Sequence, residues 1–291
     1  MRTRYRFAAV MLLHTTLAAG VYLVGKPATV HFPIPVLALF RGAVAALGFL
    51  ALARARGLDL MATFRMEPRA FLQAAFLGVL VNQVVFLCGL RFTLGAHAAL
   101  LYALTPTLVL LLGWARGVER PSLRKGAGLA LAFAGVLALF LDRDGGVLPP
   151  RWILGDLLVL AAVLAWAGYT VLSRPLSLRH GAVASTATVM VLGFLMMIPL
   201  ALLGAWNFQP AAMPARAWVG AAYLGVVASV IMYLLWVHAL GLKEPSRVAI
   251  AANGQPVLTA LLAWAFLAQA PTPHFLMGTA LVAAGVVLTQ L

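Results

Sequence analysis

Acidic residues are scarce in this sequence: Asp and Glu together number 7 among 291 residues, and all charged residues make up only 10%. Typical soluble proteins contain roughly 25% of charged residues. By contrast, 64% of this chain is hydrophobic. Such a chain cannot cover even one soluble domain with charge, so a water-soluble globular protein is excluded and the lipid bilayer is the expected environment.

Cysteine pairs and the common catalytic motifs are also missing. The one cysteine, Cys88, lies in an apolar run and has no second cysteine for a disulfide. The sequence contains no Walker A motif, no His-Glu-x-x-His pair and no serine nucleophile elbow. ATP-driven pumps and the familiar intramembrane hydrolases need these residues. We therefore expect neither an enzyme nor a bound cofactor or metal.

Basic residues outnumber acidic ones by 21 to 7, which gives a formal net charge of +14. Taken alone, this excess is typical of a nucleic-acid-binding protein. Here the basic residues stand in short gaps between long apolar runs, which is the pattern of cytoplasmic loops in membrane proteins. We therefore expect no nucleic-acid partner.

Ten apolar runs approach the roughly 20 helical residues that cross the hydrocarbon core. They cover residues 5–25, 34–54, 71–90, 95–115, 123–141, 153–174, 183–204, 217–239, 247–267 and 274–290. The runs are continuous, which excludes a β-barrel. The first run continues to Val24 without a cleavage site, so it indicates a membrane span rather than a signal peptide. The predicted fold class is an all-α integral membrane protein with ten transmembrane helices.

The distribution of Lys and Arg predicts the orientation. If the N-terminus is inside, fifteen of them flank the inner loops and five flank the outer loops. The outer five are Lys26, Arg91, Arg143, Arg151 and Arg216. By the positive-inside rule, both termini are expected on the cytoplasmic side of a bacterial-type inner membrane, which the chain crosses several times.

The two halves of the chain resemble each other. A shift of 150 residues matches several of the less common residues: Pro106 with Pro256, Trp114 with Trp264, and Pro121 with Pro271. Each half holds five spans, an odd number, so the second half is inserted upside down relative to the first. We predict two inverted five-helix repeats, the first in residues 1–145 and the second in residues 146–291.

Proline occurs near the middle of two corresponding spans. Pro106 frees the carbonyl of Tyr102, and Pro256 does the same in the second half. Paired interrupted helices face the midplane site of secondary transporters, so both prolines are candidate hinges. The alternative is a packing kink, which membrane helices tolerate. Beside Pro256, the amides of Asn253 and Gln255 are candidate substrate ligands or interhelical hydrogen-bonding groups.

Polar and aromatic residues at helical spacing form stripes along other spans. Facing inward, these stripes would enclose a cavity with aromatic walls and few fixed charges. The alternative is a mixture of core packing and interfacial aromatic belts. The candidate substrate-binding residues in these stripes are His14, Tyr22, Asn82, Tyr102, Thr105, Trp166, Tyr169, Ser229, Tyr233 and Trp236.

Ionisable residues at membrane depth are rare and therefore informative. His14 lies near the middle of the first span, where it either contacts substrate, carries a proton, or bonds a neighbouring helix as a neutral side chain. Arg41 could hold a substrate carboxylate, but snorkelling toward the interface is the favoured interpretation. Near span ends, His97, His238 and Lys26 are expected to be interface anchors.

These features together resemble one family. The chain is similar to the EamA type of the drug/metabolite transporter superfamily. The similarity lies in the ten spans and the five-span duplication, in residues 106–119 and 256–269 with the Gly-Val pairs that follow them, and in residues 20–26 followed by Arg41. Within that superfamily, the chain is first compared with the bacterial exporters of aromatic amino acids. The resemblance implies a secondary transporter that moves small metabolites outward by alternating access through a central cavity. The expected substrates are amino acids, including aromatic ones.

The resemblance also bears on the source of energy. Small multidrug antiporters of the superfamily exchange protons through a membrane-embedded glutamate, whereas here Asp156 and Glu244 lie near span ends and the other acids are in loops. We therefore expect facilitated transport of a zwitterion, with His14 as the alternative proton carrier. The alternative functions are a multidrug or sugar-phosphate carrier, a channel, and a lipid-modifying membrane enzyme. A small-molecule substrate and the bilayer are the expected partners, and the oligomeric state stays open.

Overall fold

The computed structural model describes residues 2–115, 122–140, 150–206, 208–242, 252 and 254–290. Within these ranges every regular element is helical. Seven stretches are long and apolar enough to span a membrane: Tyr5–His31, Ile34–Ala55, Pro68–Phe92, Gly95–Ala115, Arg151–His180, Ala182–Gly204 and Ala215–Trp236. Two of the other predicted spans, 123–141 and 274–290, coincide with the helices α9 (Leu123–Phe140) and α16 (Pro273–Gln290). The helix α15 (Gln255–Leu267) forms the second part of the predicted span 247–267, whose first part lies largely outside the described residues. The prediction of an all-α membrane protein is confirmed.

Three described spans of the first half consist of more than one helical segment. They are α1 (Arg2–Leu23) with α2 (Lys26–His31); α5 (Pro68–Ala75), η1 (Phe76–Val81) and α6 (Asn82–Phe92); and α7 (Gly95–Tyr102) with α8 (Thr105–Ala115). The second span is the single helix α3 (Ile34–Ala55). The short helix α4 (Leu60–Met66) lies between the second and third spans. Helices predominate because lipid offers no partner for backbone N–H and C=O groups.

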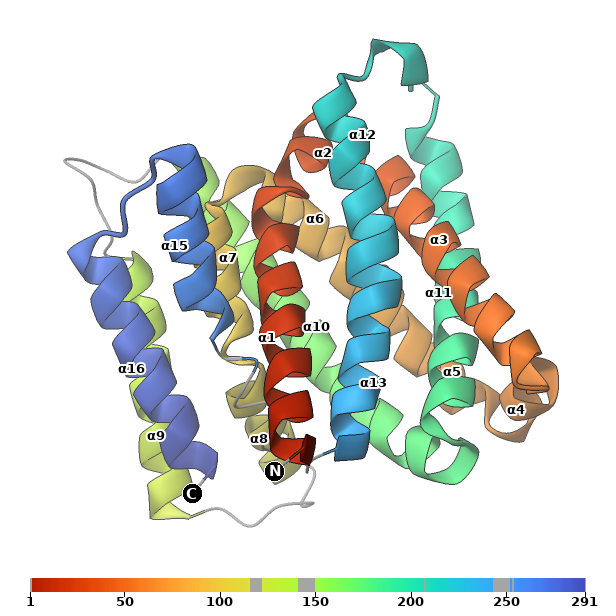
Figure 1. The fold of residues 1–291 in the computed structure, drawn as a ribbon, viewed down its shortest axis with the longest axis horizontal. Coiled ribbons are helices and arrows are strands. Elements are labelled where there is room, and N and C mark those ends of the chain that lie inside the picture. Colours follow the sequence, from red (N-terminus) through yellow and green to blue (C-terminus); the bar gives the residue numbers. More distant parts are fainter. Residues whose placement is uncertain are drawn as a thin grey trace.

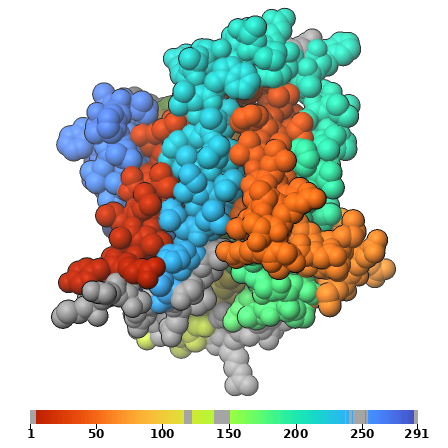
Figure 2. Space-filling view, turned by 45° about the vertical axis from the view of Figure 1, so that its right-hand side comes forward, coloured from red at the N-terminus to blue at the C-terminus, as the bar shows by residue number. Residues whose placement is uncertain are grey.

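The second half contains α10 (Pro150–His180), α11 (Ala182–Gly204), the 3₁₀ turn η2 (Pro210–Ala212), and a span built from α12 (Ala215–Ala222), η3 (Tyr223–Ile231) and α13 (Met232–Leu242). Figure 1 shows both ends of the chain on one face of the bundle, called the terminal face below. Figure 2 shows the span α12–α13 lying between α1 and α3.

Two spans differ from the predicted ends. The first span continues beyond residue 25 through α2, because Pro27 stands in the first turn of that helix, where its missing N–H does no harm. The sixth span continues beyond residue 174 to His180, with Pro175 inside the helix.

The third and eighth spans each contain a π-helical segment, η1 and η3. Both segments begin with an aromatic residue followed by Leu-Gly-Val, at Phe76 and Tyr223. A π-helical turn leaves a backbone carbonyl without its usual donor, and in η3 the Ser229 hydroxyl donates to the Leu224 carbonyl over 2.9 Å. Such turns occur frequently at functional sites.

The helices α9 and α16 pack closely against each other at one edge of the bundle (Figure 1). A Cβ atom on Gly285 would lie 2.5 Å from the Ala132 nitrogen, and one on Gly135 would lie 2.7 Å from the Gly278 carbonyl oxygen. Small residues allow backbones to approach this closely. The small-residue faces therefore serve packing within one chain.

Candidate functional site

Aromatic rings from three spans meet near the middle of the first half. Tyr22 of α1 packs against Phe86 of α6, with ring centroids 6.1 Å apart, and against Tyr102 of α7 at 6.5 Å. Phe86 and Tyr102 lie 5.3 Å apart. All three contacts are edge-on, the favoured geometry for aromatic pairs.

A second set of rings adds the sixth, eighth and second spans. Trp166 lies 5.0 Å from Tyr169 on α10 and 6.2 Å from Tyr233 of α13, and Tyr233 lies 6.0 Å from Phe49 of α3. Together with Asn82, Arg41 and Ser229, the two sets of rings are called the central cluster below.

Asn82 links α6 to two neighbouring spans. Its Nδ2 donates to Tyr102 Oη over 2.8 Å and to the Ala162 carbonyl oxygen of α10 over 2.8 Å. The side chain is buried, and the residue directly follows η1. The amide therefore ties the third span to the fourth and sixth spans.

Arg41 of α3 reaches across to η3 rather than out to the membrane surface. Its Nε donates to Ser229 Oγ over 2.8 Å, and its charge interacts electrostatically with Tyr22, Tyr102 and Tyr233. The favoured interpretation, snorkelling, is therefore wrong. The hydrogen bond to Ser229 holds the Arg41 side chain between the two helices. The sequence of the second span cannot reveal this partner, because Ser229 lies in the eighth span.

The fourth span is interrupted before Pro106. Helix α7 ends at Tyr102 and α8 begins at Thr105. Thr105 Oγ1 donates to the Tyr102 carbonyl oxygen over 2.7 Å, the group that Pro106 was predicted to free. Substrate contact by Thr105 stays a prediction, and its hydroxyl proton is used in this local bond.

The corresponding proline, Pro256, stands in the first turn of α15, which begins at Gln255. Gln255 is half-buried, and α15 packs on α1 and α7. The predicted ligand Asn253 lies outside the described residues. The hinge and ligand roles of this segment therefore stay predictions.

His14 and Trp236 pair with each other, their ring centroids 5.4 Å apart. Trp236 packs on a small group around Met11 and Ala239, nearer the terminal face than the central cluster. His14 is buried, and among the described residues its Nδ1 has no hydrogen-bond partner. The structure therefore separates these two residues from the other aromatic candidates.

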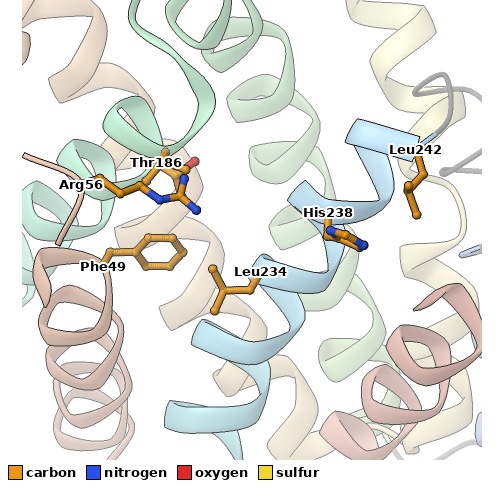
Figure 3. A pocket seen from close by; sticks show the side chains of 7 residues that line it. Phe49, Arg56, Thr186, Leu234, His238 and Leu242 are labelled. Atoms are coloured by element: carbon orange, nitrogen blue, oxygen red, sulfur yellow. The ribbon is translucent and has the colours of Figure 1, made fainter. Parts of the chain in front are cut away.

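A cavity of ≈ 480 Å³ lies at the ends of α3, α11 and α13 nearest the terminal face (Figure 3). Its lining residues are Phe49, Arg56, Val183, Thr186, Leu234, His238 and Leu242. Phe49 also contacts Tyr233, so the cavity adjoins the central cluster at this residue. It is lined by His238, expected to be an interface anchor, and by none of the predicted substrate-binding residues.

A polar network lies at the face opposite the termini. Thr93 Oγ1 donates to Asp156, whose other carboxylate oxygen lies 3.1 Å from His97 Nδ1. Lys26 Nζ donates to the Thr93 carbonyl oxygen. The network therefore connects the first, fourth and sixth spans.

Asp156 lies near the start of the sixth span, as predicted, and is completely buried there. One expectation about this network is wrong. His97 is also buried and stacks on Phe275 of α16, so it is no interface anchor. The cause is close packing: a Cβ atom on Gly155 would lie 2.7 Å from the Thr93 nitrogen.

Three residues of the central cluster, Arg41, Phe49 and Phe86, were not among the predicted site residues. A signal existed for Phe86, because the match of Phe76 with Tyr223 that starts both π-helical segments also aligns Asn82 with Ser229 and Phe86 with Tyr233. Phe49 and Arg41 lie on the second span, where only helix packing identifies the inward face.

Comparison with known proteins agrees with this architecture. Residues 6–141 and 153–291 match the EamA-like transporter family. The chain belongs to the EamA-like transporter family. The resemblance inferred from sequence is thereby confirmed, and this EamA-like protein is an all-α membrane transporter with two inverted repeats.

Three relatives show how far the similarity of this EamA-like transporter extends. An uncharacterized transporter of Archaeoglobus fulgidus is 30% identical over 219 residues, covering 74% of this chain and 73% of that protein. The uncharacterized transporter YetK of Bacillus subtilis is 26% identical over 287 residues, covering 95% and 86%. A protein of Streptantibioticus cattleyicolor, named a probable terminal-alkyne amino-acid exporter, is 28% identical over 211 residues, covering 72% and 69%.

A solved crystal structure shares the fold of this EamA-like transporter. It matches with a TM-score of 0.66 over 98% of this chain and 96% of its own, at 21% sequence identity.

Proposed function

We propose that this transporter exports amino acids, aromatic ones among them, by alternating access through the central cluster. The observation that carries the proposal is the composition of the cluster: rings and polar groups from both predicted repeats meet beside a cavity. Aromatic rings bind an aromatic side chain through stacking and edge contacts. The relative named as an amino-acid exporter supports the same class of substrate.

The charge asymmetry supports the direction. With fifteen basic residues beside the inner loops, the terminal face lies in the cytoplasm of a bacterial-type inner membrane. The cavity at that face then loads substrate from the cytoplasm, while the Asp156 network closes the other side. Rocking of residues 1–145 against 146–291 exposes the central cluster to each side in turn.

The proposed mode of transport is facilitated diffusion, driven by the concentration gradient of the substrate. A zwitterionic amino acid carries no net charge, so its movement does no work against a membrane potential, which is worth about 2.3 kcal/mol per charge per 100 mV. His14 is the alternative proton carrier. Asp156 and His97 bind each other at the face away from the cavity.

Counterflow of labelled phenylalanine and tryptophan in proteoliposomes tests the function. We expect exchange without an imposed pH gradient, and Trp166→Ala and Tyr233→Ala to raise the KM at least roughly tenfold, because each removes ring contacts. Trp206→Ala is the matched control, since that ring is 87% exposed. Wild-type protein that carries no amino acid contradicts the proposal. Uphill transport driven by protons and lost in His14→Ala contradicts facilitation.

A further inference from the structure

Arg41 is a cation in a membrane span without an acidic partner in the described part of the chain. There Asp59 caps α4, Glu67 binds Arg179 and His180, and Asp156 binds Thr93 and His97. The other acids, Glu119, Asp142, Asp144 and Glu244, belong to loops or span ends in the sequence. Charges at membrane depth face a partner or a cavity because burial of an unpaired charge is costly.

The hydrogen bond to Ser229 orients the guanidinium group. Arg41 Nε donates to Ser229 Oγ, which in turn donates to the Leu224 carbonyl oxygen of the π-helical segment. A guanidinium group that donates through Nε still has its two terminal nitrogens for other hydrogen bonds. Their forked N–H groups match the two oxygens of a carboxylate. The π-helical turn therefore holds Arg41 in place for a planar anion.

Three tyrosines, Tyr22, Tyr102 and Tyr233, lie close enough to Arg41 to interact with its charge electrostatically. Tyr102 Oη accepts a hydrogen bond from Asn82 Nδ2, so its own hydroxyl proton is left for donation. Hydroxyl donors beside a guanidinium favour an anion over a cation or an apolar group. The surrounding rings accommodate an apolar substituent on that anion.

We infer that Arg41, oriented by its hydrogen bond to Ser229, binds the carboxylate of the transported molecule. This inference rests on the proposed function and narrows it: substrates need a free carboxylate, while the corresponding amines and amides are rejected. The two terminal nitrogens of a single guanidinium group bind one carboxylate.

Ligand-induced thermal stabilisation of the purified full-length protein in detergent tests the inference. The probes are 3-phenylpropionate, which carries the carboxylate, and phenethylamine, which lacks it. We expect the carboxylate to raise the unfolding midpoint of wild type and of Arg69→Gln, which changes an exposed arginine. In Arg41→Gln the apparent affinity should fall at least roughly tenfold, because charged hydrogen bonds are lost. The apparent affinity of Arg41→Lys should lie between those of the wild type and Arg41→Gln.

Two outcomes overturn the inference: equal stabilisation by the amine, or an unchanged affinity in Arg41→Gln. If Arg41→Gln does not fold, Ser229→Ala removes only the orienting hydroxyl, and unchanged affinity there is equally contradictory. Counterflow separates this inference from the proposed function. Arg41-dependent binding of 3-phenylpropionate without amino-acid transport refutes the proposed function alone, whereas equal transport of phenylalanine and phenylalanine amide refutes the carboxylate site alone.

Discussion

Thr105 illustrates how one side chain compensates for a proline in a membrane helix. Pro106 cannot donate to the Tyr102 carbonyl oxygen, and Thr105 Oγ1 donates to it instead. An unsatisfied carbonyl in lipid costs several kcal/mol, so this hydroxyl makes the interruption of the fourth span tolerable. The interruption leaves Tyr102 at the end of α7, within hydrogen-bonding reach of Asn82.

Replacing Pro106 by Ala supplies the missing N–H and should join α7 and α8 into one continuous helix. We expect the counterflow rate to fall several-fold while the protein still inserts and purifies. Pro256→Ala should act in the same way in the second predicted repeat. Unchanged transport in both variants would leave packing as the only role of the two prolines.

The pair α9 and α16 depends on glycine at its contact surface. A Cβ atom on Gly285 would lie 2.5 Å from the Ala132 nitrogen and 2.6 Å from the Gly128 carbonyl oxygen. These neighbours are backbone atoms, which cannot rotate away. Any side chain at this position must therefore push the two helices apart.

We expect Gly285→Leu to destabilise the protein by roughly 1–3 kcal/mol, the usual cost of overpacking. Gly126→Leu on α9 is the matched control, because a Cβ atom there meets nothing within 4 Å. Thermal unfolding in detergent is the measurement. Equal midpoints for the two variants would argue against tight packing of α9 on α16.

Glu67 connects the start of α5 to the end of α10 at the terminal face. Arg179 donates to its carboxylate through Nε and Nη2, each over 2.7 Å, and His180 Nε2 lies 2.8 Å away. These bonds, first to His180 and then to Arg179, lower the pKa of the Glu67 carboxyl. Arg179 is 54% exposed, so solvent screens the contribution and keeps it small.

This lowered pKa gives a pH dependence of defined sign. The contribution of Glu67 to stability is present above the unfolded glutamate value of about 4.3 and is lost as the pH falls through the lower folded value. We expect the thermal midpoint of wild type to fall on acidification from about pH 5 to about pH 3, and to fall less in Glu67→Gln. Parallel pH profiles for the two proteins would contradict this assignment.

For the whole molecule, the two faces differ in how they are closed. The cavity lies at the terminal face. At the opposite face, Lys26, Thr93, His97 and Asp156 bind one another across three spans. A transporter that alternates must break such contacts to open that side.

Replacing Asp156 by Ala should favour opening of this face, because Thr93 and His97 lose their shared acceptor. The measurement is the labelling rate of Ala96→Cys by a membrane-impermeant thiol reagent, in a Cys88→Ser background. We expect at least a several-fold increase. Asp59→Ala is the control carboxylate, remote from the network at the start of α4. An unchanged rate would show that other contacts keep this face closed.

Reporter fusions check the orientation of the whole molecule. A reporter after Leu291 should report the cytoplasm, and one inserted within residues 142–150 should report the periplasm, because the basic residues favour the terminal face inside. Both reporters on one side would contradict five spans per half.

Much of the site followed from helical stripes, and the exceptions have a geometric cause. Seven candidates meet in the central cluster: Tyr22, Asn82, Tyr102, Trp166, Tyr169, Ser229 and Tyr233. Trp236 shares a stripe with Tyr233 but lies one turn nearer the terminal face, where it pairs with His14. A stripe identifies the face of a helix, not the depth at which a neighbouring helix supplies a partner.

The sequence by itself determined the membrane class, the ten spans, the family and the corresponding prolines, because long apolar runs and repeated residues are one-dimensional patterns. Only the tertiary structure decided the inward course of Arg41, the burial of Asp156 and the cavity beside Phe49. These features depend on the rotation of each helix about its axis and on the π-helical turns, which change that rotation partway along a span. Packing between spans far apart in the chain sets both. The hydrophobicity of a span alone does not, because lipid favours no particular rotation of an apolar helix.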